Sequence, residues 1–261
     1  MNEEKDLIGN YEVSRFPRER ITTLDFLAVN DIRHYVKGLF ELDVTDGRNI
    51  IKNYKEKPRK DLSFTSWLLY CIGTAASEYN EVHSIMKGRK KIVKFEDVDI
   101  SIAVERGIRG KKAVIPVIIR KTNEKSIDQI HKEIRNAQRE NVEGPSVLGE
   151  HSLKKKVKFY TFLPKSVRRF IIKRYLKDPF RVKKLMGTVI VTSVGMFGNL
   201  YGWPVPTTSH PLAIAVGSIT KKPGVTENQI EIREYLTMTV LLNHDVIDGA
   251  LAARFINRLK N

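Results

Sequence analysis

The chain has 261 residues, enough for one large domain or two small ones with a substantial buried core, and 41% of them are hydrophobic. No apolar run reaches the eighteen or so residues of a membrane span, and the first ten residues lack the apolar stretch of a signal peptide. The single cysteine, Cys71, excludes an internal disulfide and a cysteine-based zinc cluster. We therefore expect a cytoplasmic protein.

The formal net charge of +16 is concentrated in one segment. Residues 154–184 hold thirteen Lys and Arg and one acid, Asp178, so this segment alone carries +12. The rest of the chain has 33 bases and 29 acids, a balance of only +4. A nearly neutral domain with one basic segment argues against nucleic acid as a partner of the whole protein.

The first third of the chain is predicted to mix strands and helices. Residues 11–20 indicate an extended arm or short strand, and residues 21–36 a strand followed by a short helix. A strand over 40–44 and a helix over 47–55 follow. Ser63 then opens a clear helix, in which apolar side chains recur at three- and four-residue spacing. Cys71 lies on its apolar face and is interpreted as a core residue.

The middle of the chain predicts a hairpin and two strong strands. Residues 82–86 and 91–95 flank a turn, with His83 expected to be structural. Strands are predicted over 99–104 and 113–119, and a proline inside the second argues for a sheet edge. A helix over 126–139 begins with a capping-box pattern, and His131 falls on its polar side, which predicts a solvated histidine.

A loop over 140–158 and a basic amphipathic helix over 164–177 come next. One face of this helix is expected to carry apolar side chains and the opposite face basic ones. The apolar set is Val167, Phe170, Ile171, Tyr175 and Leu176, and the basic set is Arg168, Arg169, Lys173 and Arg174. Such a helix can pack on its own protein, dock on a partner or lie on an anionic membrane surface. The sequence leaves the three interpretations open.

The last third predicts strands separated by turns. A strand over 187–197 breaks at Gly195, and a Pro-rich loop over 202–211 leads into a strand over 212–219. A turn is expected over 221–227, followed by a strand over 230–242. The elements follow no regular strand–helix–strand order, so an α/β fold with a mixed sheet is favoured over a doubly wound one.

The C-terminal stretch is the strongest functional pattern. An apolar strand ends at Asn243 and His244, and helical spacing resumes after Gly249. A strand that stops at a histidine places an imidazole at the end of a sheet, where it can serve as a base. The alternative interpretations are a turn or core histidine and, for Asp248, a residue that only forms the turn.

The chain resembles the catalytic domain of the 2-oxo acid dehydrogenase acyltransferases, or dihydrolipoyl transacylases, which share the chloramphenicol acetyltransferase-like fold. The residues that carry the resemblance lie at 244–255 (H-D-V-I-D-G-A-L-A-A-R-F), 187–198 (G-T-V-I-V-T-S-V-G-M-F-G), 211–219, 95–104 and 113–120. Together they span about 40–140 and 187–260 in the right order. The resemblance implies an α/β fold with a mixed β-sheet and flanking helices, and a homotrimer with active sites between subunits.

The resemblance also implies roles for individual residues. His244 would be the general base that takes a proton from a thiol such as coenzyme A or dihydrolipoamide. A hydroxyl, from Thr192 or the adjacent Ser193, would stabilise the oxyanion, although Thr192 can equally be a plain strand residue. Asp248 would hold the loop and the imidazole in place. No tightly bound cofactor or metal is expected, because the coenzyme A or lipoyl thioester is itself the substrate.

This chain departs from the family pattern at several positions. Asp245 stands where an arginine usually follows the histidine, and Asn243 precedes it, so both are candidate substrate contacts. Arg18 is the candidate partner of Asp248 that the acetyltransferase branch implies. We expect one catalytic domain over 1–261, without a lipoyl domain and with a basic insertion at about 141–186. That insertion could neutralise coenzyme A phosphates or lie on a membrane.

Three functions therefore compete. The first is an acyltransferase that uses an acyl thioester, with His244 as base. The second is a catalytically silent relative that acts as a trimeric scaffold or binds a partner. The third is binding to an anionic membrane surface, or to nucleic acid, through residues 154–184.

Overall fold

The structure is a computed structural model, and it describes residues 9–17, 20–29, 33–56, 61–108, 111–139, 160, 162–195 and 201–260. At 106–108 and 111–113 the backbone alone is described. The α-helices are α2 (Arg20–Leu27), α3 (Thr45–Lys55), α4 (Phe64–Glu78), α5 (Ile127–Arg139), α7 (Lys165–Leu176), α8 (Pro179–Met186) and α9 (Gly249–Lys260). None of these helices is long and apolar enough to cross a membrane. The predicted loop over 140–158, and with it much of the expected insertion, falls outside the described residues.

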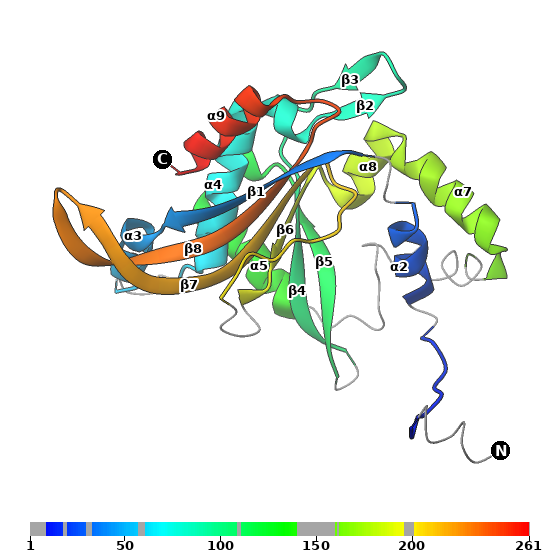
Figure 1. The fold of residues 1–261 in the computed structure, drawn as a ribbon, viewed down its shortest axis with the longest axis horizontal. Helices are drawn as coiled ribbons and strands as arrows, with labels where there is room; N and C mark the ends of the chain where they lie inside the picture. The colour runs from blue at the N-terminus through cyan, green and yellow to red at the C-terminus, as the bar shows by residue number, and fades with distance from the viewer. Residues whose placement is uncertain are drawn as a thin grey trace.

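The strands form one mixed sheet and a separate hairpin (Figure 1). They are β1 (Tyr35–Asp43), β2 (Ile85–Lys87), β3 (Lys91–Val93), β4 (Ile100–Ile108), β5 (Lys111–Ile119), β6 (Val189–Ser193), β7 (Leu212–Thr226) and β8 (Gln229–Asn243). The sheet has the order β1-β8-β7-β6-β4-β5, while β2 pairs with β3. β6 runs parallel to both of its neighbours, and the other pairs are antiparallel. The mixed sheet predicted from the sequence is confirmed.

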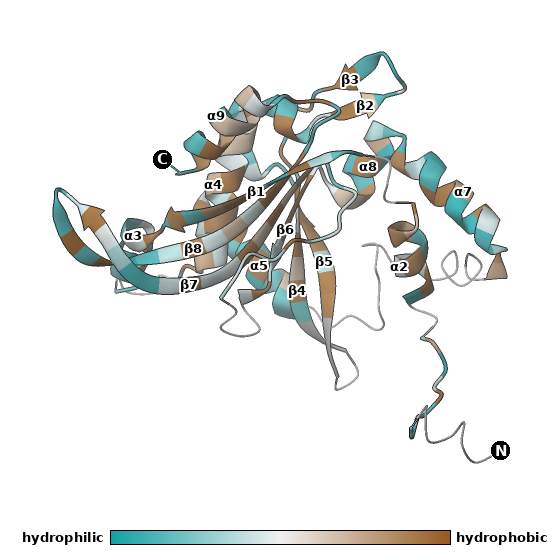
Figure 2. Cartoon of the chain, viewed as in Figure 1, coloured by the Kyte–Doolittle hydropathy of each residue, from teal (hydrophilic) through white to brown (hydrophobic). Residues whose placement is uncertain are grey.

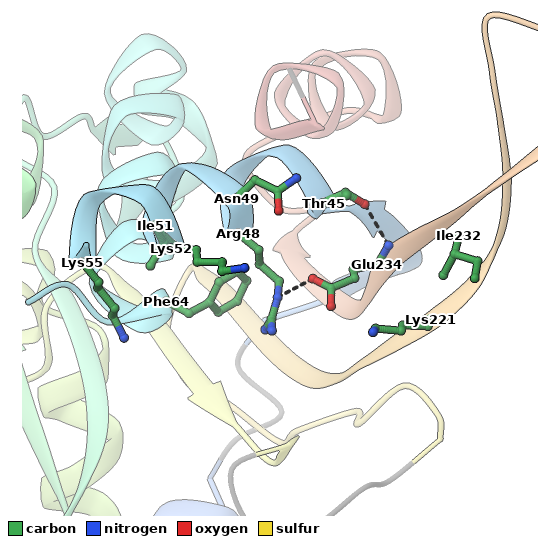
Figure 3. A pocket seen from close by; sticks show the side chains of 10 residues that line it. All are labelled: Thr45, Arg48, Asn49, Ile51, Lys52, Lys55, Phe64, Lys221, Ile232 and Glu234. Atoms are coloured by element: carbon green, nitrogen blue, oxygen red, sulfur yellow. Dashed lines mark hydrogen bonds and ion pairs between the residues drawn. The ribbon is translucent and has the colours of Figure 1, made fainter. Parts of the chain in front are cut away.

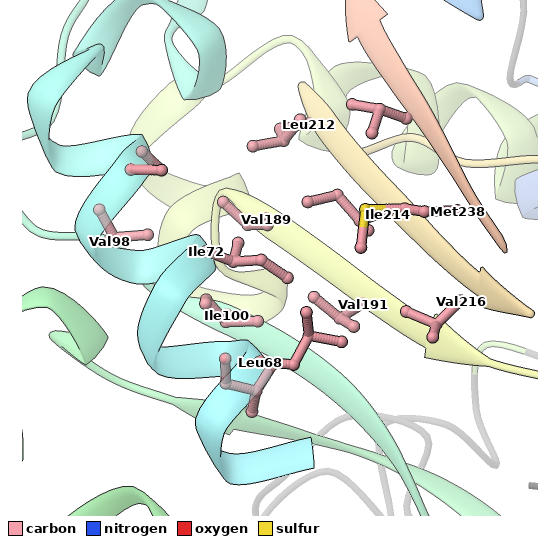
Figure 4. Packing of buried hydrophobic residues seen from close by; sticks show 14 of the residues in the cluster. Leu68, Ile72, Val98, Ile100, Val189, Val191, Leu212, Ile214, Val216 and Met238 are labelled. Atoms are coloured by element: carbon pink, nitrogen blue, oxygen red, sulfur yellow. The ribbon is translucent and has the colours of Figure 1, made fainter. Parts of the chain in front are cut away.

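The main core lies between one face of this sheet and the helices α4, α5 and α9. Figure 1 shows α4 and α5 behind the strands and α9 beside α4. Alternate strand residues point into it because successive side chains of a strand face opposite sides. Figure 4 shows strand residues facing Leu68 and Ile72 of α4, among them Val189, Val191, Leu212, Ile214, Val216 and Met238. Each such side chain contributes roughly 1.5–3 kcal/mol by leaving water.

The opposite face of the sheet carries small and polar side chains. Thr192 of β6 pairs with Ala215 of β7, which pairs with Thr239 of β8, so the three residues form one row across the sheet. Thr239 is fully buried, and its hydroxyl has no hydrogen-bond partner among the described residues. A buried hydroxyl without a partner is uncommon in folded proteins, and it marks this row as unusually polar for the middle of a sheet.

The segment that begins at Tyr201 crosses this polar face. Trp203 donates from Nε1 to the carbonyl of Phe40 in β1 at 2.9 Å. A Cβ atom at Gly217 would lie 2.9 Å from the carbonyl oxygen of Gly202, so glycine is needed for the two backbones to approach each other. The Pro-rich loop is thereby held against β1 and β7.

A smaller apolar cluster joins α7 and α8 to α2 and to Ile85 of β2. Ile172 and Leu176 of α7 are buried in it, while Arg168 turns inward to Asp25 of α2, with 2.6 Å between Nε and Oδ2. The prediction that Leu176 shares a face with Phe170 and that Arg168 lies on the exposed side is wrong. The buried carboxylate of Asp25 draws the arginine inward, and the remaining apolar side chains of α7 face outward.

Several predicted elements are confirmed in detail. Ser63 caps α4 by accepting a hydrogen bond from the N–H of Ser66 at 3.1 Å. Ser126 and Gln129 make both bonds of the capping box at the start of α5, at 2.8 and 3.3 Å. β5, which contains Pro116, lies at the edge of the sheet, where a strand can lack an N–H donor.

Other predictions are wrong for physical reasons. A helix, α2, ends at Leu27 and a strand, β1, begins at Tyr35, which reverses the order expected over residues 21–36. The turn expected over 221–227 is instead part of β7, and the hairpin turns at Glu227 and Asn228, both at positive φ. His131 is buried and accepts a hydrogen bond at Nδ1 from the N–H of Ser63 at 3.1 Å, so it bonds the start of α4 and is not solvated.

Candidate functional site

The chain turns after β8, and this turn holds His244 at the end of the sheet. The N–H of His244 donates to the carbonyl of His34, just before β1, at 2.7 Å. The N–H groups of Val246 and Ile247 both donate to the carbonyl of Asn243. The side chain of His244 is exposed, and its imidazole makes no hydrogen bond to another described residue. A fixed backbone therefore presents an accessible ring, which is what a proton-transfer group needs.

Asp248 caps the helix that follows the turn. Its Oδ1 accepts a hydrogen bond from the N–H of Leu251 at 2.9 Å, and its carbonyl accepts one from Ala252 at 3.1 Å. Within the described part of the chain, its carboxylate makes no bond to the imidazole of His244. Asp248 thus fixes where α9 begins, and through the backbone it fixes the turn that carries His244.

The side chains that flank His244 have different surroundings. Asn243 is only 3% exposed, and its Oδ1 accepts a hydrogen bond from the N–H of Asp245 at 3.3 Å. The Oδ1 of Asp245 lies 2.7 Å from Nδ1 of His34. His34 is mostly exposed, so this pair contributes at most about 1 kcal/mol. Asn243 therefore serves the turn, whereas Asp245 remains at the surface beside the imidazole.

Two buried side chains fix the segment that contains His34. Arg33 donates to the carbonyls of Ser209 and Leu176, and burial lowers its pKa. The hydroxyl of Tyr35 donates to the carbonyl of His210 at 2.9 Å, and burial raises its pKa to about 12. These bonds tie the strand beside His244 to the Pro-rich loop and to the C-terminal end of α7.

Thr192 and Ser193 end β6 and are both half-buried. Val191 points into the main core, so the alternation of a strand turns Ser193 towards the helices and Thr192 towards the polar face. Beyond them, a Cβ at Gly195 would overlap the carbonyl oxygen of Gly217. The end of β6 therefore depends on glycine to approach β7, and this close approach fixes the position of Thr192.

One chain does not bring His244 and Thr192 together. Thr192 stands level with Thr239 in the register, and His244 lies five residues beyond Thr239 along β8. At about 3.4 Å per residue this is a separation of ~17 Å along the sheet. A general base must lie about 3 Å from the proton donor, so the two side chains cannot act on one substrate within a single chain.

A basic pocket of about 690 Å³ lies between α3 and the β7–β8 hairpin (Figure 3). Its charged lining is Arg48, Lys52, Lys55, Lys221 and Glu234, and Arg48 pairs with Glu234 at 2.5 Å. Glu234 precedes His244 by ten residues of β8, which places the pocket ~34 Å away along the strand. The pocket is therefore separate from the His244 site within one chain.

The remaining candidates are less informative. Arg18, the expected partner of Asp248, lies outside the described residues. Burial raises the pKa of the Cys71 thiol to about 11, which keeps it protonated and agrees with its interpretation as a core residue. Thr239 was missed by sequence analysis because a threonine in an apolar run looks like any β-branched strand residue. No group of His, Cys, Asp and Glu side chains suited to a metal ion occurs among the described residues.

The sequence matches the family model of the 2-oxoacid dehydrogenases acyltransferase catalytic domain over residues 29–146 and 172–261. The chain belongs to this family. A curated relative in the acyltransferase family is the lipoamide acyltransferase component of the branched-chain alpha-keto acid dehydrogenase complex of Bacillus subtilis, 26% identical over 227 residues. The match covers 85% of this chain and 45% of the relative, so the chain spans less than half of that protein's length.

Solved structures show the same fold. A dihydrolipoamide acetyltransferase of Azotobacter vinelandii is 17% identical, with a TM-score of 0.67 over 97% of this chain and 91% of that one. A chloramphenicol acetyltransferase is 13% identical, with a TM-score of 0.55 over 96% of both chains. The chloramphenicol acetyltransferase-like fold expected of this acyltransferase family member is therefore confirmed.

Proposed function

We propose that the chain is an acyltransferase that moves an acyl group between a thioester and an acceptor, with His244 as general base. The observation that carries the proposal is an exposed imidazole on a hydrogen-bonded turn at the end of β8, in a chain of an acyltransferase family. Coenzyme A or a lipoyl group is the proposed thiol carrier, as a substrate that is exchanged at each turnover and not as a tightly bound cofactor.

The proposed chemistry needs one proton to move twice. The imidazole of His244 takes the proton of the attacking thiol while the sulfur adds to the acyl carbonyl carbon. The bond between the carbon of the tetrahedral intermediate and the sulfur of the original thioester then breaks. This departing sulfur takes the proton from the imidazolium. A base placed in this way contributes about 10²–10⁴ in rate. Asp248 acts as a positioning residue, because its bonds fix α9 and the turn and do not reach the imidazole.

The hydroxyl of Thr192 is the proposed donor to the oxyanion of that intermediate. The Azotobacter acetyltransferase was studied for the catalytic roles of a serine, a histidine fifty-two residues later and an asparagine four residues after that. Thr192, His244 and Asp248 have the same two spacings in this chain. Thr192 also faces the polar side of the sheet, whereas Ser193 faces the helices, so Thr192 is the better candidate.

Because His244 and Thr192 stand ~17 Å apart along one sheet, we further propose that they meet between copies of the chain. A closed ring of three copies has three equivalent interfaces, and each could join the histidine of one copy to the threonine of the next. Asp245, at the surface beside His244, is the proposed substrate contact, and Asn243 is a weaker one because it is buried. We also propose that residues 1–261 form one catalytic domain with a basic insertion at about 141–186.

A screen of acyl-coenzyme A thioesters with thiol and amine acceptors, read as release of free thiol, tests the proposal. His244→Ala should reduce the rate by about 10²–10⁴, and Thr192→Ala by about 10²–10³, while Thr192→Ser should retain most of it. Ser193→Ala serves as the matched control, because its side chain faces the helices. Equal, measurable rates for the wild type and His244→Ala would reject His244 as the base, and no thiol release by the wild type with any acceptor would leave the silent scaffold as the function.

A further inference from the structure

The outward side of α7 carries an apolar stripe that no described residue covers. Val167, Phe170 and Ile171 are 41%, 69% and 42% exposed. With Arg174 they occupy positions i, i+3, i+4 and i+7, which lie on one face of an α-helix. We call these four residues the α7 outer face. It is opposite to the buried side, where Ile172 and Leu176 pack.

Basic side chains flank this stripe. Lys173, Arg174 and Lys177 are exposed, and none of them has an ion-pair partner among the described residues. The single acid between residues 162 and 184 is Asp178, whose carboxylate is used to cap α8 through the N–H groups of Phe180 and Arg181. The α7 outer face therefore combines exposed apolar area with positive charge that is not neutralised within the described chain.

We propose that the α7 outer face docks on an anionic lipid bilayer. Apolar side chains of this kind can enter the boundary between headgroups and acyl chains, while the flanking bases contact the anionic headgroups. Arg174 lies on the α7 outer face, and Lys173 and Lys177 lie along one edge of it, so a planar surface that meets the apolar side chains also meets these bases.

The position of α7 in the fold agrees with this occupant. Figure 1 shows α7 at the rim of the molecule, apart from the main sheet. Figure 2 shows hydrophilic and hydrophobic residues interspersed along this helix. The helix is held from behind by the Asp25–Arg168 ion pair and by the cluster around Ile172. It is thus a fixed element that presents its outer face without rearrangement.

Docking would also bring the proposed base close to the bilayer. The carbonyl of Leu176, at the end of α7, accepts a hydrogen bond from Arg33 at 3.4 Å, and the carbonyl of the next residue, His34, holds the backbone of His244. This position of His244 extends the proposed function, and it rests on that function: the acyl group or its acceptor belongs to an amphiphile in the membrane surface. The docking itself does not depend on the chemistry.

Sedimentation of the whole protein with vesicles tests the docking. The wild type should pellet with vesicles of phosphatidylcholine and 30% phosphatidylglycerol, remain in solution with pure phosphatidylcholine, and be released by high salt. Lys173→Glu with Arg174→Glu should weaken the affinity at least about twenty-five-fold, since each base contributes about fivefold. Phe170→Ser with Ile171→Ser should weaken it by a similar or larger factor.

Val225→Ser with Ile230→Ser is the matched control, because it removes two apolar side chains at the tip of the β7–β8 hairpin that are more exposed, at 76% and 79%, than Phe170 and Ile171. This control should bind the vesicles like the wild type, and so should His244→Ala. The α7 variants should keep the wild-type rate on a soluble acyl-coenzyme A, which separates failure of docking from failure of the acyltransferase function.

Four results would overturn the proposal. They are no pelleting of the wild type, equal pelleting of the α7 variants, an altered mass of the assembly in those variants, and tighter binding to a duplex oligonucleotide than to vesicles. The third result would assign the α7 outer face to contacts between copies, and the fourth to nucleic acid.

Discussion

Mixing two inactive variants should restore activity if His244 and Thr192 act between copies of the chain. His244→Ala retains Thr192, and Thr192→Ala retains His244. In a ring with two copies of one variant and one of the other, one of the three directed interfaces joins an intact histidine to an intact threonine. Mixed trimers should therefore recover about one third of the wild-type rate per chain. Each variant alone should be slower by about a hundredfold or more.

The assay uses co-expression of the two variants with different affinity tags, purification through both tags, and measurement of thiol release from an acyl-coenzyme A. Mixed trimers of His244→Ala and His244→Asn are the control, since no interface in them contains an intact histidine. The basis of the prediction is the ~17 Å between the two residues along the sheet. Recovery no greater than that of the control would refute the shared site.

Three further predictions follow from single contacts. Asp248→Ala removes the cap of α9 and should lower the free energy of unfolding by about 1 kcal/mol in a urea titration, whereas Asp248→Asn, which can still accept the bond, should be nearly neutral. Asp245→Asn should change stability by less than about 1 kcal/mol, because its pair with His34 is exposed, so a raised KM without loss of stability would mark a substrate contact. Burial lowers the pKa of His83 and of His210 from 6.5 to about 4, so the unfolded chain binds these protons first as pH falls. Stability should then decrease between about pH 6.5 and 4, by up to about 1.4 kcal/mol per pH unit for each histidine; a flat profile over this range in denaturant titrations would contradict that linkage.

Local patterns were sufficient where one interaction decides the structure. The capping box at Ser126, the cap at Ser63 and the edge position of Pro116 each follow from the bonding capacity of one or two residues. The position of His244 at the end of a strand, and of Asp248 before a helix, could be read in the same way. These features depend on neighbours in sequence and not on distant parts of the chain.

Long-range contacts decided the features that the sequence did not reveal. Arg168 faces inward because Asp25 lies 143 residues away in sequence but beside it in space. His131 is buried because its Nδ1 accepts from the start of another helix. The separation of His244 from Thr192 depends on the register of three strands, which no periodicity within one strand contains. For the same reason the sequence does not place Thr239 in the same row of the sheet as Thr192.

The shortest strand of the main sheet has a role larger than its length. β6 has five residues, and among the described strands it alone joins the β1-β8-β7 group to the β4-β5 pair. It can insert only after the long connection from β5 has folded back, and its second neighbour, β7, comes later in the chain. We expect the two antiparallel groups to form early and independently and to be joined late. The folding step that completes the sheet would then also place the Thr192 hydroxyl on the polar face.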